Sequence, residues 1–234
     1  MTHQSYEQLA ESIFTCGRCS LWDRERPGYF PKFGAGNPDR PRVMLLTQNP
    51  AEPNDREKAG GNARVSPREM REMYAAGIAE YHNDARRGGG IDLGTTFAQH
   101  GIRWLAETYY SEAFKCVASQ LTAVAAEEAA EACRGHLAAE LSLVAPRSII
   151  TLGGGALRYL YLALGKKPPR VTVTQWWASE PLEPKQIWRD GDDPLLVLPL
   201  FHPSPEGWQR AGLRQGDWAR AFERCVARVV QLGV

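Results

Sequence analysis

The chain alternates short apolar runs with longer segments of helical periodicity, and this alternation limits its possible folds more than any other feature. The apolar runs are VMLLT (43–47), YYSEAFK (109–115), SIITL (148–152) and LLVLPLF (195–201). Each run is long enough for one strand, and a helix-length segment separates it from the next. Such alternation favours a parallel sheet with helices on both faces. We therefore expect an α/β three-layer sandwich with a four-stranded, mainly parallel central sheet flanked by helices.

Amphipathic patterns predict the helices that would cover this sheet, at residues 67–82, 123–144, 154–164 and 216–233. The last segment carries its apolar residues on one face, and these are Trp218, Phe222, Cys225, Val226, Val229 and Val230. Cys225 is therefore interpreted as a core residue. Three other stretches are expected to form a lid-like loop (85–96), a late strand holding two tryptophans (174–180) and a surface turn (188–194).

Length and composition are those of an ordinary soluble protein. The chain has 234 residues, of which 43% are hydrophobic and 24% charged, so one domain spanning residues 1–234 is expected. The N-terminal MTHQSYEQLAESIF lacks the basic start and apolar block of a signal peptide, and no apolar run reaches the length of a membrane span. We expect a cytoplasmic monomer that does not associate with membranes.

A net charge of +1 excludes a bulk polycation, so any nucleic-acid binding would require a local basic face. One candidate is a segment that interleaves aromatic residues with the basic residues Arg24, Arg26, Lys32, Arg40 and Arg42. Charged and aromatic side chains together suit a phosphate backbone and its bases. Solvated loop charge is the simpler alternative.

The last apolar run ends in LPLFHPSPEGW (198–208), where His202 is followed by Pro203, Ser204 and Pro205. Proline fixes its own φ and donates no backbone hydrogen bond, so the strand stops here. A histidine on a stiff turn at a strand's carboxyl end lies where open α/β sheets bind ligands. A loop histidine that merely caps the strand is the alternative.

Five cysteines in a chain expected to be cytoplasmic are not expected to form disulfides. Cys16 and Cys19 form a Cys-x2-Cys pair, Cys116 follows the second apolar run, and Cys133 lies within the next helical segment. Four thiolates can hold a tetrahedral zinc or an iron–sulfur cluster. The Cys-x2-Cys spacing by itself favours zinc.

Several motifs occur in an order that resembles the uracil-DNA glycosylase superfamily, specifically its iron–sulfur branch. TCGRCSLW resembles the opening cysteine pair of that branch, and FGAGNPDRPRVMLLTQNPAEPND resembles its first strand and first active-site loop. FKC (114–116) resembles the end of its second strand, CRGHLAAELSLVAPRSIITLGGGAL its fourth cysteine and third strand, and FHPSP its second active-site loop. The resemblance implies that Cys16, Cys19, Cys116 and Cys133 hold a [4Fe-4S] cluster, with zinc as second choice.

The resemblance also implies a reaction, in which a base is extruded from DNA and its N-glycosidic bond is hydrolysed. His202 would stabilise the negative charge that develops on the departing base. Asn49 would position the attacking water, although an amide is a poor base. Gln48 would contact the base, and Ser204 would contact a phosphate.

Three departures from the family pattern leave the substrate open. The first loop reads Thr-Gln-Asn-Pro-Ala where the branch has Gly-Glu-x-Pro-Gly, and the small Ala51 does not supply the bulk that excludes thymine in some branches. Glu112 stands four residues before Cys116, where the branch reads the uracil edge with an asparagine. An ionised carboxylate only accepts hydrogen bonds, whereas an amide also donates. The alternative is that the register slips and Glu112 points elsewhere.

The third departure is a missing aromatic, because nothing in REKAGGNARV matches the residue that stacks on the base. An insertion at 64–100 offers Tyr74, Tyr81 and Phe97 in its place, and each could equally be a packing residue. Trp208 is a candidate wedge for the space left by a flipped base, or a core residue. Gly153–Gly155 lack dinucleotide-binding spacing and are interpreted as a strand-to-helix turn.

The sequence therefore predicts a DNA glycosylase that removes uracil or another deaminated base. The alternative is a non-catalytic, iron–sulfur nucleic-acid-binding member of the same superfamily. A zinc-stabilised hydrolase of small molecules has only the analogy of fold to support it.

Overall fold

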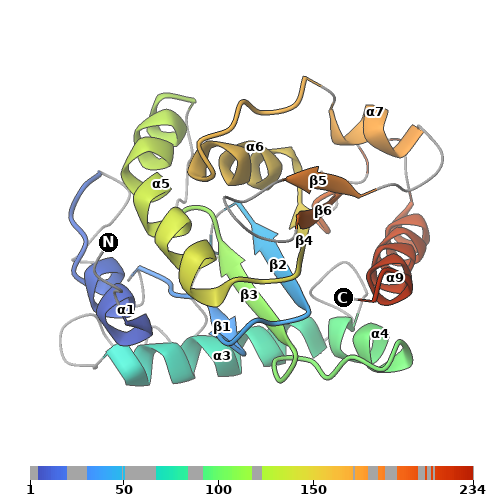
Figure 1. The fold of residues 1–234 in the computed structure, drawn as a ribbon, viewed down its shortest axis with the longest axis horizontal. Coiled ribbons are helices and arrows are strands. Elements are labelled where there is room, and N and C mark those ends of the chain that lie inside the picture. Colours follow the sequence, from blue (N-terminus) through green and yellow to red (C-terminus); the bar gives the residue numbers. More distant parts are fainter. Residues whose placement is uncertain are drawn as a thin grey trace.

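A sheet of six strands, in the order β1-β3-β2-β4-β6-β5, forms the centre of the computed structural model (Figure 1). The structure describes residues 5–19, 31–48, 50, 67–83, 92–117, 123–170, 172–178, 184–187, 194–204, 209, 212 and 214–233. The strands are β1 (Ala35–Gly36), β2 (Val43–Thr47), β3 (Thr108–Glu112), β4 (Ser148–Leu152), β5 (Lys185–Ile187) and β6 (Leu195–Leu200).

The four strands predicted from the apolar runs are the inner strands of this sheet, and they are mutually parallel. Two short edge strands extend the predicted sheet, β1 antiparallel to β3 and β5 antiparallel to β6. At two and three residues they are too short to give a periodic signal. Strand β3 ends at Glu112, three residues before the predicted end, because the chain bends through residues 113–116.

The described helices are α1 (Tyr6–Phe14), α3 (Pro67–Asn83), α4 (Leu93–Gln99), α5 (Ala123–Val144), α6 (Gly154–Ala163), α7 (Val173–Ala178) and α9 (Gln215–Gln231). The four predicted helices correspond to α3, α5, α6 and α9. The prediction of a loop through 96 was wrong beyond residue 92, where the Asp92 carboxylate accepts from Thr95 N–H and begins α4. The late strand predicted at 174–180 was also wrong, because residues 173–178 form α7.

Helices lie on both sides of the sheet, as the three-layer prediction requires. Helix α6 packs against β2, β4 and β6 and is in contact with α5. Helices α3 and α4 pack together on the opposite side, and α4 in turn contacts α9 (Figure 1). Right-handed crossovers that move outward from β2 in both directions place the connecting helices on opposite faces. The fold class predicted from the sequence is confirmed.

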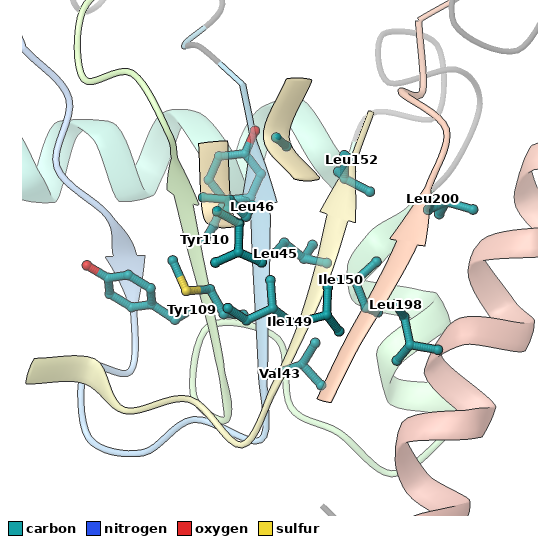
Figure 2. Packing of buried hydrophobic residues seen from close by; sticks show 14 of the residues in the cluster. Val43, Leu45, Leu46, Tyr109, Tyr110, Ile149, Ile150, Leu152, Leu198 and Leu200 are labelled. Carbon is teal, nitrogen blue, oxygen red and sulfur yellow. The ribbon is translucent and has the colours of Figure 1, made fainter. Parts of the chain in front are cut away.

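The core forms where the inner strands bury residues on both faces. Every residue of β2, β3, β4 and β6 is buried. Figure 2 shows the apolar side chains of these strands in contact, among them Leu45, Tyr109, Ile150 and Leu198. Strands buried on both faces explain why these segments read as continuous apolar runs and do not alternate. Among the described helices, none is long and apolar enough to span a membrane.

Candidate active site

The carboxyl ends of the four parallel strands meet at one edge of the sheet, where α/β proteins of this kind bind ligands. Glu112 ends β3, Gln48 follows β2, Gly153 follows β4, and His202 lies two residues beyond the end of β6. Residues that are more than 150 positions apart in the chain are thereby brought to one edge. This confirms the predicted place of His202 at a strand's carboxyl end.

His202 lies in a short turn whose backbone fixes the imidazole. Ser204 N–H donates to His202 Nδ1 at 3.1 Å, across the intervening Pro203. In a neutral imidazole one nitrogen accepts and the other carries the proton. The backbone bond therefore selects the tautomer with its proton on Nε2. Both His202 and Ser204 are half-buried, so the side chain is held without being sealed in the core.

Two tryptophans brace the chain just before this histidine. Trp218 of α9 donates its indole N–H to the carbonyl of Phe201 at 2.8 Å. Trp177 of α7 donates to the carbonyl of Pro199, also at 2.8 Å. Trp218 was predicted as a core residue, which its burial confirms, but its bond to the residue preceding His202 has no signal in the sequence.

The chain just after β2, where the resemblance predicts the first active-site loop, is hydrogen-bonded on one side and packed on the other. The carbonyls of Thr47 and Gln48 accept from Ala113 N–H and Phe114 N–H, at 2.9 and 2.8 Å. The Gln48 side chain lies against Gly155, in the first turn of α6. Asn49 and Ala51, predicted to position water and to line the base pocket, lie outside the described residues, as does Trp208.

Glu112 is in register with Thr47 on β2 and is only 2% exposed. The hydroxyl of Tyr74, from α3, donates to Glu112 Oε1. The Lys32 ammonium lies 5.2 Å from the centre of the Tyr74 ring. Of the three aromatic residues of the insertion, Tyr74 thus reaches this edge of the sheet, whereas Phe97 stacks on Trp104 in the core. The side chain of Tyr81 lies outside the described residues.

The four cysteines of the predicted cluster come from three elements on the β3 side of the fold. Cys16 and Cys19 follow α1, Cys116 follows β3, and Cys133 lies within α5. Figure 1 shows α1 beside α5. Arg18 lies between the first two cysteines in the sequence, and its Nη1 is 4.0 Å from the position that a Cβ on Gly135 of α5 would take.

The four thiols are close enough to influence one another. Burial raises the pKa of Cys116 well above its usual range, and the other three thiols raise it further. Burial also raises the pKa of Cys133, and the nearby Lys115 partly opposes this. A set of four cysteine sulfurs suits both candidate groups, [4Fe-4S] and zinc. Within the described residues, however, no three or more of His, Cys, Asp and Glu stand close enough together to hold a metal ion.

Cys225 is separate from this set. It is fully buried in α9, and burial raises its pKa to about 12, which keeps it a neutral thiol. The prediction that it is a core residue is confirmed.

Of the basic segment suggested for nucleic-acid binding, the structure describes Lys32, Arg40 and Arg42. Lys32 is 1% exposed, and Arg40 and Arg42 precede β2, at the opposite end of the sheet from His202. Arg24 and Arg26 lie outside the described residues. The interpretation of these residues as a DNA-binding patch is therefore wrong for the buried Lys32, and for Arg40 and Arg42 it stays a prediction.

Comparison with known proteins agrees with the motifs. The family model of the uracil DNA glycosylase superfamily matches residues 33–225, which include all four parallel strands. A protein of Sulfurisphaera tokodaii named type-4 uracil-DNA glycosylase is 20% identical over 203 residues, covering 86% of this chain and 74% of that protein. The chain belongs to the uracil DNA glycosylase superfamily.

Proposed function

We propose that this protein is a DNA glycosylase that hydrolyses the N-glycosidic bond of uracil or another deaminated base, as the first step of base excision repair. The observation that carries the proposal is the packing of both active-site loops against the start of α6. His202 lies beside Gly153 and Gln48 beside Gly155, so the described residues of the two loops lie at one edge of the sheet. Superfamily membership and the similarity to a type-4 enzyme support this choice.

In this reaction water adds to C1′ of the sugar and the bond from C1′ to the base breaks, its electron pair leaving with the base. His202 Nε2–H donates to the base as this negative charge develops, which lowers the energy of the transition state. Its tautomer is already set by Ser204 N–H, so no reorganisation is needed. Asn49 orients the attacking water, and the proton that the water loses passes to solvent.

The remaining candidate residues bind the substrate. Gln48 and Glu112 contact the base, Ser204 contacts a phosphate, and the small Ala51 leaves room beside the base. Because Tyr74 covers Glu112, a base reaches this carboxylate only if the phenol side chain shifts.

The cysteine set completes the proposal. Cys16, Cys19, Cys116 and Cys133 would hold a [4Fe-4S] cluster, with zinc as second choice. The cluster would supply a structural tie between the chain after α1, the end of β3 and α5. The resemblance of the cysteine motifs to the iron–sulfur branch supports it, and so does the raising of the Cys116 pKa by burial and by the other three thiols.

A second candidate is a non-catalytic, cluster-bearing protein that binds nucleic acid. The observation in its favour is the position of Glu112, which is buried beneath Tyr74 where the family would read the base. Such a protein would bind DNA in a salt-dependent way whether or not a modified base is present.

The test is base release from oligonucleotides that carry uracil, hypoxanthine, xanthine or a thymine mismatch, measured as alkali-sensitive breaks. We expect His202→Ala to lower the rate about 10²- to 10³-fold, the usual effect of removing one donor to a developing anion. His100→Ala is the matched control, because this partly buried histidine caps α4 and its Nε2 has no hydrogen-bond partner among the described residues. DNA binding without release from any substrate would contradict the proposal and support the second candidate.

A further inference from the structure

The three consecutive glycines at 153–155 differ in what surrounds the position of a side chain. Gly153 has φ +98° and lies where β4 turns into α6, and a Cβ built there would lie 3.5 Å from His202 Cβ. Gly154 has open space, since the nearest atom to such a Cβ is Val173 Cγ2 at 4.0 Å. A Cβ on Gly155 would overlap Gln48 Oε1 and lie 2.5 Å from Gln48 Cδ.

The backbone at Gly155 does not itself require glycine. Residue 155 lies within α6 and is not among the residues with positive φ. Glycine is the poorest helix former after proline, so a glycine in this turn weakens the helix. The side chain of Gln48 supplies the reason for its presence, because it occupies the volume that any larger residue would fill.

We propose that Gly155 is a positioning residue for the first active-site loop, and this rests on the proposed function of that loop. The missing side chain at 155 lets the Gln48 amide lie on the first turn of α6. The Gln48 carbonyl is held from the other side by Phe114 N–H at 2.8 Å. Gln48 is therefore held by its backbone against the chain that follows β3 and by its side chain against α6.

The contact also sets which end of the amide remains for the substrate. The first turn of a helix carries partial positive charge, which favours an oxygen beside it. Gln48 Oε1 is the atom nearest to the Cβ position of Gly155. The amide nitrogen is then left to donate, so Gln48 favours a carbonyl oxygen on the base or the lone pair of the attacking water.

The first experiment compares Gly155→Ala with Gly154→Ala in release of uracil from DNA. Both variants add one methyl group to neighbouring positions of the same helical turn, but only the first displaces Gln48. We expect Gly155→Ala to lower kcat about 10- to 100-fold, the cost of a small misplacement at a reacting centre. KM should change less than kcat, and Gly154→Ala should keep the wild-type rate. Equal rates for the two variants would overturn the proposal.

A second measurement does not depend on activity. In the wild-type background Gly155→Ala should raise the midpoint of thermal unfolding less than in a Gln48→Ala background, because the Gln48 side chain must first move aside. In a Gln48→Ala background the same change should raise the midpoint, because alanine is the better helix former. The same shift in both backgrounds would overturn the contact. The protein could instead release no base while the effect of Gly155→Ala on the unfolding midpoint still depends on residue 48. That result would support the contact between Gln48 and Gly155 and reject the proposed glycosylase activity.

Discussion

Ser204 controls His202 through its backbone, because its N–H selects the imidazole tautomer. Replacement by proline removes this donor, whereas replacement by alanine keeps it. We expect Ser204→Pro to lower kcat by at least about tenfold, since the proton on Nε2 is no longer enforced. Ser204→Ala should instead raise KM, through loss of the phosphate contact that we propose for the hydroxyl. Single-turnover base release over a range of DNA concentrations separates the two, and equal kcat for both variants would contradict this role of the backbone.

If Glu112 contacts the base as proposed, a substitution there should alter which base is preferred. Glu112→Gln keeps the side-chain length and can still accept from the Tyr74 hydroxyl, but it adds a donor for a base carbonyl. One added hydrogen bond is worth about 1 kcal/mol, so uracil release should rise about fivefold in kcat/KM. Glu107→Gln, immediately before the other end of β3, is the matched control. If kcat/KM for uracil release is unchanged in Glu112→Gln, Glu112 does not face the base.

The position of His202 was predictable from its own neighbours, but that of Tyr74 was not. An apolar run followed by His-Pro-Ser-Pro determines locally where the strand ends. Tyr74 and Glu112 are 38 residues apart and meet because α3 packs beside the sheet. No local pattern distinguishes a tyrosine that packs in the core from one that bonds to a carboxylate.

Between elements, a buried ion pair joins α5 to the end of β3. The Lys115 ammonium pairs with Glu140, which also accepts from Tyr109 at 2.7 Å and Ser111 at 2.8 Å. Removal of one member of a buried pair leaves an uncompensated charge. We expect Glu140→Ala to lower the free energy of unfolding by about 3–5 kcal/mol.

The control for this prediction is on the same helix. Glu131 pairs with Arg134 at 3.1 Å, and both side chains are exposed. Glu131→Ala should cost about 0–1 kcal/mol, because water screens exposed pairs. Urea unfolding of both variants gives the comparison, and equal losses would mean that the buried network does not join α5 to β3.

Three described helices that the apolar pattern did not predict, α1, α4 and α7, begin with a local signal, and for α4 this is the Asp92 cap. Ser5 and Gln8 form a capping box at the start of α1. Thr172 and Gln175 exchange the same two bonds at the start of α7, at 3.1 and 2.9 Å. Ser or Thr followed three residues later by Gln marks a helix start. The two tryptophans of 174–180 favoured a strand by propensity, and the cap at Thr172 outweighed it.

At the scale of the molecule, substitutions of the cysteines test whether the chain carries its proposed cofactor. Cys116→Ala should abolish bound iron and sulfide, together with the visible absorption of a cluster. Cys225→Ala, a buried cysteine outside the set, should retain them. Elemental analysis of the two purified variants measures the metal that each one binds. Zinc in place of iron would favour the second choice of metal, and unchanged iron in Cys116→Ala would contradict the assignment.

The sequence by itself determined the four parallel strands, the helices α3, α5, α6 and α9, the superfamily and the place of His202. These depend on short-range patterns: apolar runs, helical periodicity and the restrictions that proline imposes. A single domain, a cytoplasmic location and a monomeric state stay predictions from the same patterns. The tertiary structure decided that Tyr74 covers Glu112, that two tryptophans bond to the chain before His202, and that the Gln48 side chain lies against Gly155. Each of these joins residues whose separation in the chain says nothing of their distance in space, because the packing of helices on the sheet determines which side chains meet.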